Sequence, residues 1–339
     1  MQAYQIAAFG LEQLARVELP DPVPGPGQVV VGVRAASLNY RDLMMVQGRY
    51  DPRQALPLVP LSDGAGEVLA VGAGVTRVSV GARVAGVFNQ GWLAGAPGRA
   101  ARKTTLGGPL PGMLAERALL SAEGVVPIPD HLSFAQAATL PCAGVTAWTA
   151  LMDDGGVRPG ETVLVQGTGG VSTFALQLAH AAGARVIATS SSPEKLARAR
   201  ELGAWATIDY RATPDWEQEV RRLTEGEGVD LVVEVGGAET LRRSLGCVRL
   251  GGRIAIIGVL SGRKTELDLA PVLMQRVRLQ GVFVGSRAHF EALNRAVAAQ
   301  RLEPVIDRVF PFAAAPAAFE HLAAGRHQGK VVISLEEAA

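Results

Sequence analysis

The chain has 339 residues, 48% of them hydrophobic and 19% charged, and its formal net charge is +1. This composition excludes a disordered chain, and the near-neutral charge gives no support for a nucleic-acid-binding surface. Because the chain is too long for one typical core, we expect two domains.

Cysteine content and hydropathy favour the cytoplasm. The chain has two cysteines, Cys142 and Cys247, which excludes a disulfide framework and suits a reducing compartment. No apolar run reaches the roughly 18 residues that span a bilayer, so we expect no membrane partner. The first six residues lack the basic and apolar regions of a signal peptide.

The first third of the chain predicts a small β-barrel. It is rich in Gly, Pro and Val, and short strands separated by glycine turns are expected at 28–36, 64–72 and 82–88. The segment 88–114 that follows is polar, rich in glycine and without periodicity. A loop of this length in a compact domain is usually a lid, a binding loop or a disordered segment.

After Pro141 the pattern changes to strands alternating with helices. Ser192 and Pro193 predict the start of one helix and Gly203 its end, and 215–223 is an amphipathic helix. Such alternation predicts a doubly wound parallel sheet and an α/β fold. The six strands that we expect are 162–166, 185–189, 206–209, 230–235, 253–257 and 277–284.

The last segment predicts a helix at 288–297 and strands at 305–310 and 330–335. The parallel sheet already contains six expected strands, so these two are surplus to it. We therefore expect them to return to the first domain.

A glycine turn follows the first strand of the parallel sheet. Gly167 permits a tight turn, and Gly169 lets the backbone approach a pyrophosphate at the start of a helix. Ser172 stands where the dinucleotide fingerprint has a third Gly or an Ala, and its hydroxyl could bind a phosphate. The alternative is a purely structural turn. The expected cofactor contacts are Gly167, Thr168, Gly169, Gly170, Val171 and Ser172.

The end of the second strand favours NADP(H) over NAD. An NAD site usually has an acidic residue there, whereas this chain has Ser190, Ser191 and Ser192 with Lys195 close behind. Hydroxyls and an ammonium attract a 2′-phosphate. The alternative is that the serines cap a helix and the cations are solvated, and Glu194 opposes the NADP preference.

Several segments together resemble the medium-chain dehydrogenase/reductase superfamily, and among its members the zinc-independent quinone oxidoreductases and their alcohol-dehydrogenase-like relatives. The similarity covers essentially the whole chain. It depends on the residues 38–42 (LNYRD), 64–68 (GAGEV), 140–148 (LPCAGVTAW) and 329–332 (GKVV), and on the glycine turn.

The resemblance implies a domain organisation. A GroES-like catalytic domain would contain residues 1–125 and 286–339, and a Rossmann domain would occupy 126–285, with the active site between the two. Members of the superfamily commonly form homodimers through the last Rossmann strand, which is 279–284 here.

The resemblance also implies further cofactor contacts, all inferred by position. Thr146 would contact the nicotinamide side, and Tyr210 would lie near the adenosine phosphate. Val284 would meet the carboxamide, and Lys330 would reach the pyrophosphate. The remaining positions follow the fourth and fifth strands and are Gly236, Gly237, Gly258, Val259 and Leu260.

The zinc ligands of zinc-dependent relatives are not matched. Asn39 replaces a cysteine, Ser62 and Asp63 replace a His-Glu pair, and Cys142 alone remains. Since a catalytic zinc needs three protein ligands, we expect no metal.

Without a metal, the small-molecule substrate should already be activated, as in a quinone, an enone or an enoyl thioester. We expect Asn39 and Tyr40 to donate to the substrate oxygen, Arg41 to assist electrostatically and Asp42 to hold Arg41. The alternative for Asn39 and Asp42 is that they cap the following helix. Phe88, Asn89, Trp92 and Leu93 could line the pocket.

Two other functions stay open. One is an NADP-dependent alcohol dehydrogenase or carbonyl reductase, which the missing Lewis acid disfavours. The other is a sensor that binds NADPH without turnover.

Overall fold

The computed structural model describes residues 1–336 and divides into two compact units. The first contains Met1–Val145 and the C-terminal segment from Gly285, and the second is Thr146–Val284. The expected boundary at residue 126 is therefore too early. It differs because β7 (Val125–Pro127) pairs with β5 (Arg83–Gly86), and α2 (Phe134–Ala137) contacts strands of the first unit.

The first unit is built on a seven-stranded sheet in the order β14-β15-β3-β4-β5-β7, with β6 paired to β3. Its strands outside the pair just described are β3 (Gln28–Leu38), β4 (Asp63–Val71), β6 (Arg117–Ser121), β14 (Ile306–Pro311) and β15 (Lys330–Ser334). The expected return of the two last strands is confirmed, because β15 runs antiparallel beside β3.

Short elements complete the first unit. β1 (Gln2–Ile6) and β2 (Leu14–Glu18) form a separate two-stranded sheet. Its remaining helices are α1 (Tyr40–Val46), α9 (Arg287–Gln300) and α10 (Ala315–Ala323). Single 3-10 turns lie at Leu11–Gln13, Ala101–Thr104, Ala122–Gly124 and Phe312–Ala314, and a π-helical turn lies at Leu140–Gly144.

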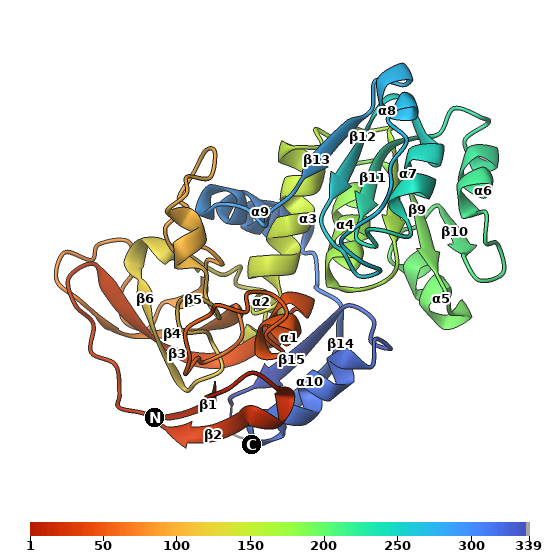
Figure 1. The fold of residues 1–339 in the computed structure, drawn as a ribbon. Coiled ribbons are helices and arrows are strands. Elements are labelled where there is room, and N and C mark those ends of the chain that lie inside the picture. The colour runs from red at the N-terminus through yellow and green to blue at the C-terminus, as the bar shows by residue number, and fades with distance from the viewer. Residues whose placement is uncertain (337–339) are drawn as a thin grey trace. The chain divides into compact units, whose positions relative to one another are not determined.

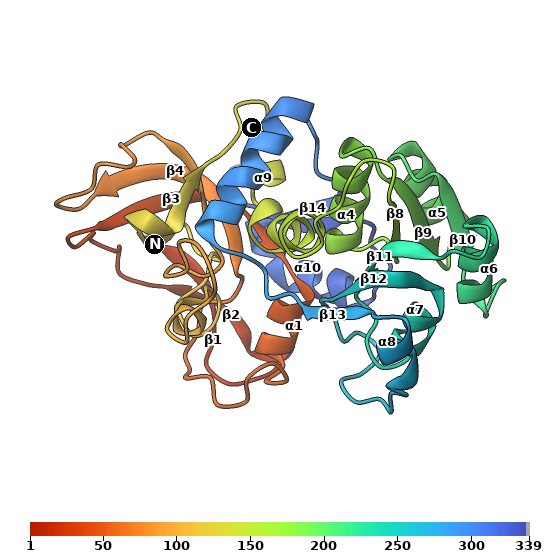
Figure 2. The same ribbon diagram turned by 90° about the horizontal axis from the view of Figure 1, so that it is seen from above.

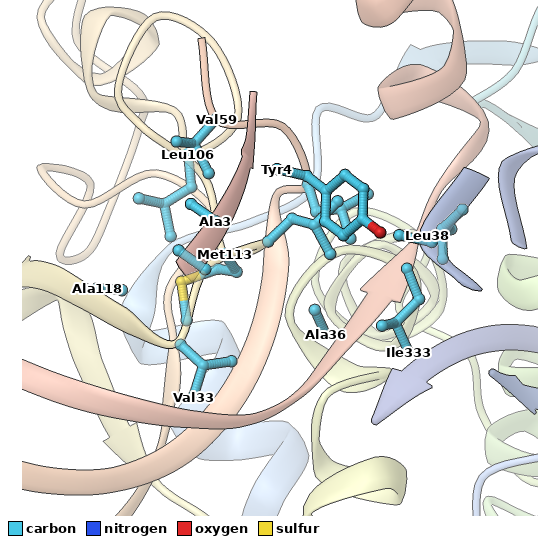
Figure 3. Close-up of a cluster of buried hydrophobic side chains, with 14 of the residues drawn as sticks. Ala3, Tyr4, Val33, Ala36, Leu38, Val59, Leu106, Met113, Ala118 and Ile333 are labelled. Carbon is cyan, nitrogen blue, oxygen red and sulfur yellow. The ribbon is translucent and has the colours of Figure 1, made fainter. Parts of the chain in front are cut away.

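The core of the first unit joins distant parts of the chain. Tyr4, Leu38, Met113 and Ile333 belong to one buried apolar cluster, and Figure 3 shows their side chains grouped between strands from both ends of the sequence. Burial of this surface is the main favourable term that holds β15 onto the N-terminal strands.

The segment 88–114 is anchored at its ends. Asn89 accepts a hydrogen bond from Thr105 at 2.6 Å, and the backbone oxygen of Trp92 accepts one from the N–H of Arg287 at 2.9 Å. Phe88, Asn89 and Trp92 are buried, whereas Leu93 is exposed. Of the four residues expected to line a pocket, three are therefore packed inside the first unit.

The second unit is a six-stranded parallel sheet in the order β10-β9-β8-β11-β12-β13. Its strands are β8 (Thr162–Gln166), β9 (Arg185–Ser190), β10 (Ala206–Asp209), β11 (Val229–Glu234), β12 (Val248–Ile256) and β13 (Arg278–Gly281). All six expected strands are confirmed. The order reverses between β8 and β11, and open parallel sheets bind ligands at such a switch point.

Helices cover both faces of the parallel sheet. Figures 1 and 2 show α4 (Gly170–Ala181) and α5 (Pro193–Glu201) on one side of the strands, and α7 (Leu241–Cys247) and α8 (Ala270–Met274) on the other. The remaining elements are α3 (Val145–Trp148), α6 (Trp216–Leu223) and a π-helical turn at Thr149–Asp153. Within residues 1–336, no helix is long and apolar enough to cross a membrane.

Candidate cofactor and catalytic sites

The glycine turn connects β8 to α4 in the second unit. Gly167 has a φ of +69°, which favours glycine, and Gly169 is the N-cap of α4. A Cβ added at either position would meet nothing within 4 Å, so the turn borders open space. No side chain caps the first turn of α4. Its backbone N–H groups are therefore oriented to bind an anion such as a pyrophosphate.

Ser172 is packed inward rather than toward this open space. Its buried hydroxyl donates to the backbone oxygen of Gln166 at 2.7 Å. The suggested phosphate contact of Ser172 is therefore not supported. The serine instead joins α4 to the end of β8, where the fingerprint glycine would allow close packing.

The residues after β9 have separate roles. Ser190 is buried, and its backbone oxygen accepts from the N–H of Tyr210 at 3.1 Å, which brings the expected adenosine-side residues together. Ser192 caps α5 and donates to the Glu194 carboxylate at 2.9 Å. The helix-cap alternative is thus correct for Ser192, while Ser191 and Lys195 are half-buried.

The carboxylate of Glu234, which no sequence motif indicated, forms hydrogen bonds to the loop after β11. Both Gly236 and Gly237 donate their backbone N–H to buried Glu234, at 2.8 and 2.9 Å. These N–H groups are therefore engaged inside the protein and are not directed at a ligand. Gly258 also donates its N–H to the backbone oxygen of Glu234 at 3.2 Å.

The other predicted cofactor residues lie at ends of elements. Val259 and Leu260 are exposed after β12. Thr146 is buried in α3. Val284 is buried with a φ of +52°, an outlier for a β-branched residue and a sign of local backbone strain.

A buried polar cluster occupies the predicted catalytic region of the first unit. The ammonium of Lys330, at the start of β15, donates to the Leu38 backbone oxygen at 2.7 Å and to Oδ1 of Asn39. It also lies 3.5 Å from Oδ2 of Asp63, at the start of β4. Three strands therefore bring these side chains together, although they are far apart in the sequence.

This cluster changes the roles of Asn39 and Lys330. The Nδ2 group of Asn39 donates to Asp63 at 2.8 Å and to Ser62 at 3.3 Å, so both of its N–H bonds are used. The structure leaves Asn39 no donor for a substrate oxygen, contrary to expectation. Lys330 is buried against the same residues, which does not support the expected pyrophosphate contact.

Asp42 and Arg41 hold the start of α1 in place. Asp42 accepts from the Asn39 backbone N–H at 2.9 Å, from the Ser62 hydroxyl at 3.0 Å and from Arg41 at 3.0 Å. Both proposed roles of Asp42 are therefore present, since it caps the helix and holds Arg41. The buried guanidinium of Arg41 also donates to the Leu106 backbone oxygen at 3.1 Å.

Tyr40 differs from its neighbours because 38% of its surface is exposed. It is the first residue of α1, directly after Asn39. Of the four predicted catalytic residues, Tyr40 is the one that solvent reaches most readily.

The donor set of this cluster does not fit a zinc ion. Burial raises the pKa of Asp63 to about 7, although Lys330 and Asn39 oppose the shift. Burial, and then the Asp63 carboxylate, also raise the pKa of the Cys142 thiol, which disfavours a thiolate ligand. The ammonium of Lys330 lies against the oxygen atoms that a cation would need. Residues 1–336 contain no group of three or more His, Cys, Asp or Glu able to hold a metal.

The raised pKa of Asp63 predicts a pH-dependent stability. Between pH 4 and 7 the folded state holds a proton on Asp63 that the unfolded state has lost, so this group's contribution to stability falls as the pH rises. The slope is at most about 1.4 kcal/mol per pH unit. Asp63→Asn removes this dependence. Urea unfolding from pH 5 to 8 should therefore show the wild type losing stability relative to the variant.

Asp130→Asn, at an exposed position of the same unit, is the control and should keep the wild-type profile. Parallel pH profiles for the wild type and Asp63→Asn would contradict the assignment.

Comparison with known proteins agrees with both units. Residues 25–130 match the family model of the alcohol dehydrogenase GroES-like domain, and 170–299 match that of the zinc-binding dehydrogenases. A zinc-type alcohol dehydrogenase-like protein of Schizosaccharomyces pombe is 42% identical over 98% of this chain and 97% of its own. A quinone oxidoreductase of Pseudomonas aeruginosa is 36% identical over 97% of this chain and 98% of its own.

Solved structures give the same result. A structure described as an NAD-dependent alcohol dehydrogenase has a TM-score of 0.91 and 39% identity, covering 99% of this chain and 100% of its own. A crotonyl-CoA carboxylase/reductase in complex with NADP has a TM-score of 0.86 and 26% identity, covering 98% of this chain and 94% of its own. The chain is therefore an oxidoreductase that belongs to the medium-chain dehydrogenase/reductase superfamily.

Proposed function

We propose that this oxidoreductase is zinc-independent and uses NADPH to transfer a hydride to an activated C=C or C=O bond. The observation that carries the proposal is the Lys330 ammonium, which donates to Asn39 and lies against Asp63 in the predicted catalytic region. A quinone, an enone or an enoyl thioester delocalises the developing negative charge itself. A plain carbonyl lacks this stabilisation and accepts hydride more readily when a Lewis acid polarises it.

The glycine turn fits a dinucleotide. Gly167, Gly169 and the first N–H groups of α4 would hold the pyrophosphate, because the turn borders open space and the helix start is uncapped. NADPH, when bound, supplies the hydride.

Recognition of a 2′-phosphate would depend on Ser191, Lys195 and Tyr210, near the end of β9. A relative described as NAD-dependent keeps NADH open, and the Glu194 carboxylate beside Ser192 favours that alternative. The NADP complex of the crotonyl-CoA carboxylase/reductase supports the preferred assignment.

The cofactor preference can be tested at Lys195. Lys195→Ala should raise the Kd for NADPH about tenfold and leave that for NADH unchanged, since only NADPH carries the 2′-phosphate. Fluorescence titration with both cofactors measures this. Arg200→Ala, on the exposed face of the same helix, is the control. Equal changes for both cofactors would argue against a 2′-phosphate contact.

Tyr40 is the proton donor that we assign. After hydride reaches the β-carbon of an enone or an enoyl thioester, the enolate must be protonated, and a phenol is a suitable acid. The exposed Tyr40 can meet a ligand, whereas both amide N–H bonds of Asn39 are occupied.

The assignment predicts that Tyr40→Phe lowers kcat with an enone about a hundredfold and leaves NADPH binding intact. Tyr50→Phe is a matched control, because it keeps the aromatic ring over Arg41 and removes only a hydroxyl. The assay uses NADPH oxidation with enones, quinones, enoyl thioesters and aldehydes, with and without a chelator.

The same panel separates the other functions. Turnover of aldehydes alone, lost on chelation, would favour the alcohol dehydrogenase or carbonyl reductase that the names of several relatives suggest. NADPH binding without any turnover would favour a sensor. The cytoplasm remains our expected compartment, since neither Cys142 nor Cys247 forms a disulfide.

A homodimer through β13 is part of the proposal. β13 is at the end of the parallel sheet, and apolar side chains are exposed on and beside α8, which precedes it. Leu273 and Met274 are 76% and 74% exposed, and Leu250 is exposed next to Gly251, which donates to the Gln275 backbone oxygen. A second copy of the chain would cover this apolar surface and the strand edge.

Leu273→Glu should therefore convert a dimer into a monomer, because it places a charge in the apolar contact. Light scattering after size-exclusion chromatography measures the mass. Val80→Glu, at an exposed position of the first unit, should remain dimeric. A wild-type chain that is monomeric at all concentrations would refute the dimer.

A further inference from the structure

We propose that Glu234 is a positioning residue that holds the two cofactor-binding loops of the second unit in one arrangement. The inference depends on the proposed cofactor site and adds a residue to it that neither the motifs nor the resemblance indicated. Glu234 ends β11, which lies beside β8 at the point where the strand order reverses. The loops that leave these two strands are the ones that a dinucleotide would contact.

The first carboxylate oxygen of Glu234 organises the loop after β11. Oε1 accepts from the N–H groups of Gly236 and Gly237 at 2.8 and 2.9 Å, and from the hydroxyl of Thr240 at 2.6 Å. Gly237 has a φ of +93°, so this loop needs glycine to fold back onto the carboxylate.

The second oxygen reaches the glycine turn. Oε2 accepts from Nε2 of Gln166 at 2.8 Å and from the hydroxyl of Ser244. Gln166 is the last residue of β8 and directly precedes Gly167. Its own Oε1 accepts from the N–H groups of Val235 and Gly236, each at 3.4 Å. Hydrogen bonds therefore join the two loops both ways: Gln166 donates to Glu234 and accepts from the backbone of the loop after β11.

The position of Gln166 is constrained further by its backbone. Its oxygen accepts from Ser172 at 2.7 Å, which ties the same residue to α4. Glu234 thus restrains the start of the glycine turn through the side chain of Gln166, while Ser172 restrains it through the backbone oxygen of Gln166.

The donors around Glu234 require both of its side-chain oxygens to accept hydrogen bonds. Glu234 is buried and receives five hydrogen bonds from neutral donors. Glutamine has the same shape, but one of its oxygens is replaced by an NH2 group that would face another N–H. Hydrogen bonds to a charged group are stronger than those between neutral groups, so this mismatch should distort the loops.

The test is a swap of the two side chains. Glu234→Gln alone should weaken NADPH binding at least about tenfold in a fluorescence titration, with kcat at saturating NADPH changed less. The double variant Gln166→Glu/Glu234→Gln restores a donor opposite an acceptor and should bind within about threefold of the wild type. Glu239→Gln, exposed in the same loop, is the control and should bind normally.

Hydrogen exchange supplies a readout that does not involve the cofactor. In Glu234→Gln the backbone amides of Gly236 and Gly237 should exchange at least about tenfold faster, while those of β10 keep their protection. Faster exchange throughout the second unit would mean a general loss of stability and would overturn the positioning role.

The outcomes separate this inference from the proposed function. If the wild type binds neither NADPH nor NADH, the proposed cofactor site is wrong and the inference fails with it. If the wild type binds and Glu234→Gln binds equally well, only the inference is wrong. If Glu234→Gln does not fold, the double variant decides: binding within about threefold of the wild type supports the inference, and any larger loss overturns it.

Discussion

The buried ammonium of Lys330 is the constraint on which the first unit's candidate chemistry depends. A buried charge is costly unless it is paired and hydrogen-bonded, and Lys330 obtains both from Leu38, Asn39 and Asp63. These contacts join β15 to β3 and β4. They also orient the Asn39 amide, occupy its oxygen and exclude a cation from the same space.

The second unit uses the opposite charge in a comparable way. The carboxylate of Glu234 accepts hydrogen bonds from Gln166 at the end of β8, from Gly237 in the loop after β11 and from Ser244 within α7. Each unit thus places a buried ionic group at the strand ends where function is proposed. Neither group needs to touch a ligand to matter, because each determines which neighbouring donors remain available.

Local patterns predicted the elements well. Ser192 and Pro193 mark the observed start of α5, and the glycine turn follows β8 at the expected residue. Apolar runs alternating with helical segments identified the parallel strands, most clearly β8 and β11, because burial on both faces leaves such strands continuously apolar. The boundary at residue 126, which the resemblance implied, was too early, whereas the change to alternating strands and helices after Pro141 lies close to the observed boundary between Val145 and Thr146.

The sequence by itself determined the α/β class, the glycine turn and the loss of the usual zinc ligands at Asn39, Ser62 and Asp63, since each can be recognised from the residue types along the chain. Only the tertiary structure decided which polar atoms are already occupied. Asn39 looked like a free donor until Lys330, 291 positions away, and Asp63 were placed beside it. Ser172 looked like a phosphate ligand until its hydroxyl was found on Gln166. A buried polar group forms its hydrogen bonds with residues of whichever strands the fold brings near. The spacing of residues along the sequence does not identify these partners.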